Sequence, residues 1–258
     1  MRFALALSYI TLLESLRKRT FYGVFGTLCV FLFLSSALAG FSLQDNLKPI
    51  VDMGYSSLSL VMVVATLFLS TDIMGEDLRR GGIYTVLSVG VSRSVYIFAR
   101  ALSLFAVVLL LTAVLGGTFL LFLSLVAGVG SLPAGLLALS VLAFKMWVLS
   151  CIVLFLSSFL KNFFLVFLGG VAVYWAGSSI ESLYYFVSME EELPPYGKLS
   201  VKVLFFLLPS FSSIGPDVIL GLEKVEPLPT VLDLIKALFY ALSLILGASL
   251  IFEKRELG

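Results

Sequence analysis

MGEDLRRGGIYTVLSVGVSRSVYIFAR, residues 74–100, is the longest charged interruption in the first two thirds of a very apolar chain. It holds two acids, two arginines, two adjacent glycines and two further arginines that open the next apolar run: Glu76, Asp77, Arg79, Arg80, Gly81, Gly82, Arg93 and Arg100. Span-length apolar runs on both sides predict that the segment joins two membrane-spanning helices. Its arginines predict the side of the membrane on which Lys and Arg collect.

The composition identifies the class of protein. Of 258 residues, 60% are hydrophobic and 13% are charged, whereas a soluble domain carries about 25% charged residues. This number of charged residues is too small to cover a water-facing surface. We therefore expect an integral membrane protein with a single domain. Histidine is absent, which removes the commonest proton shuttle and metal ligand. Cys29 and Cys151 lie inside apolar runs, where we expect core residues and neither a disulfide nor a metal site.

The apolar runs predict an all-α polytopic membrane protein, because a helix needs about 20 apolar residues to cross a bilayer. Six transmembrane helices are expected within one domain, at about 21–40, 52–74, 95–126, 136–159, 163–179 and 230–252. The run at 95–126 exceeds a span, so we expect tilt or a cytoplasmic extension. Its pair Gly116-Gly117 predicts close packing or a kink. Region 180–229 is expected as a net acidic outer loop, in which the short apolar stretch 203–208 predicts a re-entrant piece.

Residues 2–19 predict an interfacial helix on the cytoplasmic surface. Polar residues recur at three- and four-residue spacing, and so line one face of a helix: Ser8, Thr11, Ser15 and Lys18. The run ends in three basic residues, 17–19, where a signal peptide would show a small-residue cleavage site. The alternative is a plain cytoplasmic extension of the first span.

The basic residues predict the orientation of the chain in the membrane. With both termini in the cytoplasm, the inner side collects Arg2, Arg17, Lys18, Arg19, Arg79, Arg80, Arg93, Arg100, Lys161, Lys254 and Arg255. The outer side keeps Lys48, Lys198, Lys202, Lys224 and Lys236, so that every arginine lies inside. We therefore expect a multi-pass protein of the inner cell membrane with an even number of spans.

No catalytic constellation is present in the sequence, so no catalytic, cofactor-binding or metal-binding residue is predicted. Without histidine there is no Ser-His-Asp arrangement, and neither zinc spacing nor a phosphate-binding glycine loop occurs. Lys145 is the one basic residue deep within a predicted span, and such residues are costly and often functional. It would line a polar cavity or pair with an acid such as Asp52 or Glu181. The alternatives are that it snorkels outward or that the span boundaries differ.

Several stretches resemble a known family. Two acids end the second predicted span, and they are followed by Gly81-Gly82-Ile83-Tyr84-Thr85-Val86-Leu87-Ser88, by Val91-Ser92-Arg93 and by Tyr96-Ile97. Stretches 13–19, 207–210 and 251–257 match the start, the segment before the last span and the tail of the same family. In order and spacing these stretches resemble the permease subunits of type-2 ABC exporters. Gly90-Val91 replaces the family's proline before Ser-Arg, and Ile83 replaces the threonine of its Gly-Thr step.

The resemblance implies the transmembrane subunit of an ATP-driven exporter, which moves a substrate out of the cytoplasm and pairs as a homodimer or heterodimer. Separate cytoplasmic ABC ATPase subunits would bind Mg-ATP, so the chain itself is expected to be neither an enzyme nor a cofactor-binding protein. Residues 81–89 would form the coupling helix that docks in a groove of the ATPase. The implied coupling residues are Glu76, Asp77, Arg79, Arg80, Gly81, Gly82, Ile83, Tyr84, Leu87 and Arg93.

Two other functions stay open at this point. An ion-coupled secondary transporter needs buried acids in mid-span, whereas the sequence offers acids only at span boundaries, together with Lys145. A membrane anchor or assembly factor for a cytoplasmic ATPase would differ little in sequence from a permease. The lipid bilayer is an expected partner in all three cases, and nucleic acid is not.

Overall fold

The computed structural model describes residues 2–17, 19–39, 47–79, 92–160, 162–189, 195–209, 211 and 227–254. Within these ranges the chain is almost wholly helical and has no strand. The helices are α1 (Arg2–Arg17), α2 (Arg19–Ala39), α3 (Leu47–Arg79), α5 (Arg93–Leu111), α6 (Gly117–Val126), α7 (Leu132–Phe159), α8 (Phe163–Met189), α9 (Pro195–Leu207) and α11 (Pro227–Lys254). A π-helical turn, Thr112–Gly116, joins α5 to α6, and a short 3-10 turn, Val129–Ser131, precedes α7.

Five of the described helical stretches are long and apolar enough to cross a membrane: Lys48–Gly75, Arg93–Leu125, Leu132–Phe159, Phe163–Val187 and Leu234–Glu253. Helices suit this environment because all their backbone groups bond within the segment. The chain is therefore a helical, multi-pass membrane protein. The first predicted span, 21–40, falls on α2, whose described apolar part is the shorter stretch Tyr22–Leu34. The six-span layout accordingly stays a prediction.

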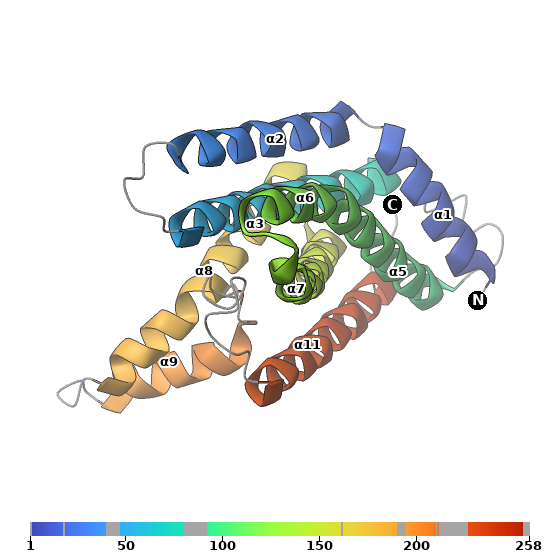
Figure 1. The fold of residues 1–258 in the computed structure, drawn as a ribbon. Helices are drawn as coiled ribbons and strands as arrows, with labels where there is room; N and C mark the ends of the chain where they lie inside the picture. The colour runs from blue at the N-terminus through green and yellow to red at the C-terminus, as the bar shows by residue number, and fades with distance from the viewer. Residues whose placement is uncertain are drawn as a thin grey trace.

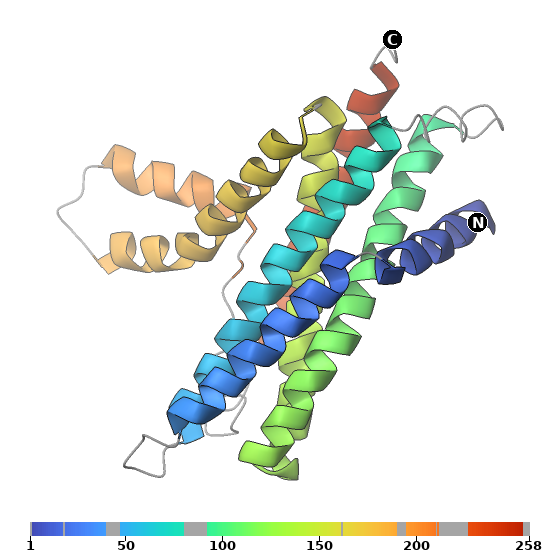
Figure 2. The ribbon, with the colours of Figure 1, turned by 90° about the horizontal axis from the view of Figure 1, so that it is seen from above.

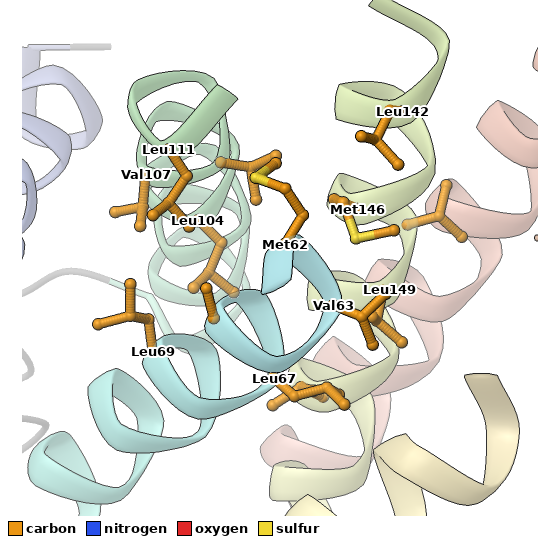
Figure 3. Packing of buried hydrophobic residues seen from close by; sticks show 14 of the residues in the cluster. Met62, Val63, Leu67, Leu69, Leu104, Val107, Leu111, Leu142, Met146 and Leu149 are labelled. Carbon is orange, nitrogen blue, oxygen red and sulfur yellow. The ribbon is translucent and has the colours of Figure 1, made fainter. Parts of the chain in front are cut away.

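Helix α7 lies at the centre of the bundle, where α3, α5, α6, α8 and α11 all contact it (Figure 1). Large apolar side chains from three helices meet there (Figure 3): Met62 and Leu67 from α3, Leu104 and Leu111 from α5, and Met146 and Leu149 from α7. Because lipid is as apolar as leucine, this packing stabilises the bundle through close van der Waals contact, not through exclusion of water.

In the third predicted span, close packing is one of the two roles foreseen for the glycine pair, and Gly116 fills it. An added Cβ at Gly116 would lie 2.9 Å from Leu139 Cδ1, whereas one at Gly117 would meet nothing within 4 Å. Gly116 therefore allows close approach to α7. It also ends the π-helical turn, whose backbone is wider than that of an α-helix. The helix is thus both closely packed and irregular at one point.

Helices α8 and α9 form a hairpin that leans away from the rest of the bundle (Figure 2). The fifth span was predicted to end at 179, which is wrong for the helix, because α8 continues to Met189. The error arose from the polar residues Ser178, Ser179 and Glu181, which interrupt the hydropathy without breaking the helix. The predicted loop 180–229 likewise contains α9, whose last residues include most of the proposed re-entrant stretch.

A glycine in α8 receives the chain that follows α9. The backbone N–H of Phe211 donates to the carbonyl oxygen of Gly177 at 3.3 Å. An added Cβ at Gly177 would lie 2.5 Å from the carbonyl oxygen of Pro209 and 2.7 Å from the Phe211 ring. Only glycine permits so close an approach of backbone to helix. The ring of Phe211 packs on Tyr174 at a centroid distance of 5.3 Å.

Candidate functional site

The helices before and after the predicted coupling segment, α3 and α5, have ends that lie together at one end of the bundle, here called the basic end. There α3 ends at Arg79, α5 begins at Arg93 and α11 ends at Lys254, and Figure 2 shows these three ends together. Glu76, Asp77 and Arg79 belong to the last turns of α3, but their side chains lie outside the described part of the structure. The remaining predicted coupling residues before α5 lie outside the described residues altogether: Arg80, Gly81, Gly82, Ile83, Tyr84 and Leu87.

Arg93 fastens the first turn of α5 to the last turn of α11. Its Nη1 group donates to the carbonyl oxygens of Glu253 at 3.0 Å and Phe252 at 3.4 Å. The last carbonyls of a helix lack partners within the helix and carry the negative end of its dipole, so a guanidinium there is stabilising. One turn further along α5, the ring of Tyr96 stacks on Phe252 at 6.1 Å. A charged contact and an apolar contact therefore join the same two helix ends.

Arg100 is a second link, and one that was not among the predicted site residues. It is only 5% exposed, although it lies within a membrane-spanning stretch. Its Nη1 group donates to the hydroxyl oxygen of Thr11 at 2.9 Å, and its Nη2 group makes a longer contact, 3.5 Å, with the carbonyl oxygen of Ile73. Because a buried charge is costly unless it is hydrogen-bonded, these contacts offset part of the cost of burying Arg100. One side chain thus joins α5 to α1 and α3.

The polar face of α1 is turned inward, toward α5. Ser8, Thr11 and Ser15 are buried, whereas Tyr9 is 64% exposed and Ile10 60% exposed. The hydroxyls find partners inside the protein. Thr11 donates to a carbonyl of its own helix at 2.8 Å while it accepts from Arg100, and Ser15 donates to the carbonyl of Thr11. The position of residues 2–19 at the membrane surface stays a prediction.

Lys145 lies far from the basic end, at the middle of the 28-residue helix α7, and is partly buried. About 20 Å of helix separates it from either end of α7, and a lysine side chain reaches roughly 6 Å, so snorkelling does not bring it to an end. Asp52, one suggested partner, is exposed. One turn after Asp52, the hydroxyl of Tyr55 contacts the carbonyl oxygen of Ala138 at 3.5 Å, two turns before Lys145. The other suggested partner, Glu181, has a side chain outside the described part.

Sequence reasoning missed Arg100 and Thr11, although a signal for each was present. An arginine inside a span-length apolar run is as costly as a lysine there, and the polar stripe on residues 2–19 needed a partner. Neither signal alone showed that the two would meet.

The described contacts at the basic end hold helix ends together. Charged hydrogen bonds connect α5 to three other helices, and such bonds are among the stronger ones in proteins. Within the described ranges, no group of three or more His, Cys, Asp or Glu residues is placed to hold a metal ion.

Comparison of the chain with models of known protein families and with curated protein sequences found no match.

Proposed function

We propose that this chain is the transmembrane subunit of an ATP-driven exporter of the type-2 ABC kind, which moves a substrate out of the cytoplasm with the energy of separate ATPase subunits. The observation that supports it most is the set of links made by α5. This helix begins directly after the predicted coupling segment, and Arg93 and Arg100 attach it to α11, α1 and α3. A movement of that segment would therefore be passed to four helices together.

The proposal also accounts for the source of the energy for export. The sequence has no phosphate-binding loop, so energy from ATP has to arrive through a partner. A partner that closes on binding ATP moves the segment between α3 and α5, and rigid helices carry that movement across the bilayer. Coupling of this kind needs stiff connections where the force enters, and the arginine contacts supply them.

The test is to purify the tagged full-length chain from its native membranes and to identify the proteins that accompany it. An ABC ATPase is expected to co-purify, and its hydrolysis of ATP is expected to respond to the permease. Replacing residues 81–89 by an equal length of Gly-Ser should abolish both effects. The same replacement at residues 190–194, which are predicted to lie on the opposite side, should leave both unchanged.

The two competing functions give different results. Proton or sodium flux through liposomes that hold this chain alone would contradict the exporter and favour an ion-coupled transporter. Co-purification of an ATPase that survives replacement of residues 81–89 would contradict the coupling role of that segment and favour an anchor or assembly factor.

A further inference from the structure

We propose that Lys145 and Lys236 together form a site for the anionic headgroup of an amphiphile, on the side of the bundle where α7 and α11 meet the α8–α9 hairpin. The inference names a substrate class and rests on the proposed function for its biological meaning. The positions of the two lysines, their aromatic neighbours and the exposed apolar surface beside them support the site.

The two lysines lie at the same depth in the bundle. Helices α7 and α11 both end at the basic end, because α5 and α6 lead away from it and α7 returns (Figure 2). A contact between them fixes their register: an added Cβ at Gly247 in α11 would lie 3.1 Å from the ring of Phe155 in α7. Lys145 precedes Phe155 by ten residues and Lys236 precedes Gly247 by eleven. Each lysine is thus about 15 Å further from the basic end than the shared contact.

Helical spacing shows on which side of α7 and of α11 each lysine lies. On α7, Leu156 faces α8, since an added Cβ at Gly169 would lie 3.0 Å from it. Lys145 precedes Leu156 by eleven residues, which is close to three helical turns, so both lie on the same side of α7. The same spacing places Lys236, which is exposed, on the side of α11 that carries Gly247. The Nζ atom of Lys236 lies 6.0 Å from the centre of the Phe205 ring in α9.

An anionic headgroup suits this placement because two ammonium groups at one depth of a membrane protein raise the local potential. Intramembrane lysines commonly mark the path of a charged substrate. Lys236 contacts the face of Phe205, and Phe205 stacks on Tyr184 at 4.6 Å, so aromatic surface adjoins the charge. Phe239, one turn from Lys236 on α11, is 67% exposed. Apolar surface beside cationic groups favours a ligand with a tail as well as a charge.

The test uses the full-length chain in neutral maltoside micelles and measures the binding of dodecyl phosphate by calorimetry. Saturable binding is expected, and inorganic phosphate and dodecanol should each bind at least about tenfold more weakly. Lys145→Met and Lys236→Met should each weaken binding by about tenfold. Lys202→Met, which removes an exposed lysine of α9, is the matched control and should bind as the unaltered chain does.

Three results would overturn the site: no saturable binding, unchanged binding in both lysine variants, or an equal loss in Lys202→Met. If Lys145→Met does not give monodisperse protein, the binding measured with Lys236→Met decides whether the site exists. Lys145→Arg keeps the charge, so its affinity for dodecyl phosphate should be within about twofold of that of the unaltered chain. Binding unchanged in Lys236→Met would then overturn the site.

A transported amphiphile and a resident bilayer lipid share this chemistry, and competition distinguishes them. Phosphatidylglycerol added to the micelles displaces dodecyl phosphate if a bilayer lipid is the occupant, and fails to displace it if the site selects a smaller amphiphile. Both results support the site. Because no ATPase is present, a negative binding result leaves the exporter proposal standing, and failure to find an ATPase leaves the site standing.

Discussion

The basic end of the bundle and the α8–α9 hairpin are held by different kinds of contact. At the basic end, arginine side chains donate to carbonyl and hydroxyl oxygens of three other helices. The hairpin relies on stacked rings and on the close approach of backbone at Gly177. Hydrogen bonds from charged groups are about twice as strong as neutral ones, whereas an aromatic pair adds about 0.5–1.5 kcal/mol beyond its burial. The difference predicts that the basic end is the more firmly fastened of the two regions.

The largest effect on this comparison is expected from Arg100→Met. It removes a buried guanidinium that joins α1, α3 and α5, and the loss of charged hydrogen bonds should cost about 3 kcal/mol. We expect a lower unfolding temperature in detergent and faster hydrogen exchange in α1. Arg100→Lys keeps the charge but cannot make two forked contacts. Its unfolding temperature should therefore lie between those of Arg100→Met and the unaltered chain. Unchanged exchange in α1 would remove the basis for a fastened basic end.

An intermediate effect is expected from Gly177→Ala. The new methyl group would overlap the carbonyl oxygen of Pro209 and the ring of Phe211, and relief of the overlap should cost about 2 kcal/mol. Gly117→Ala is a matched control, because its methyl group would meet nothing within 4 Å and alanine favours a helix by up to about 1 kcal/mol. Thermal unfolding of the two variants should therefore shift in opposite directions. Equal shifts would show that chain packing at Gly177 is unimportant.

The smallest effect is expected from Phe205→Leu. Leucine keeps apolar bulk but loses the stack on Tyr184 and the contact with Lys236, which together contribute about 1 kcal/mol. Global stability should change little, but hydrogen exchange in α9 should increase while that in α1 stays the same. A destabilisation as large as that of Arg100→Met would mean that the hairpin is as firmly fastened as the basic end.

The sequence predicted the helical membrane class well, because hydropathy alone carries that information. It predicted long helices less well where polar residues lie inside them, as at Ser178 and Ser179 in α8. Tertiary partners were out of reach: Arg100 and Thr11 are 89 residues apart, and no local pattern shows which face of α1 meets α5. The predicted coupling residues from Arg80 to Leu87 lie outside the described residues, so their role rests on the resemblance and on the helices that flank them.

The π-helical turn at Thr112–Gly116 has a mechanical consequence for the long rod made by α5 and α6. Contacts at the basic end hold the first arm of this rod, and Leu139 packs against Gly116 about two thirds of the way along it. A π-helical turn is a place where a helix commonly bends. If the first arm is pushed, the rod is therefore expected to bend first at this turn, beside the contact between Leu139 and Gly116.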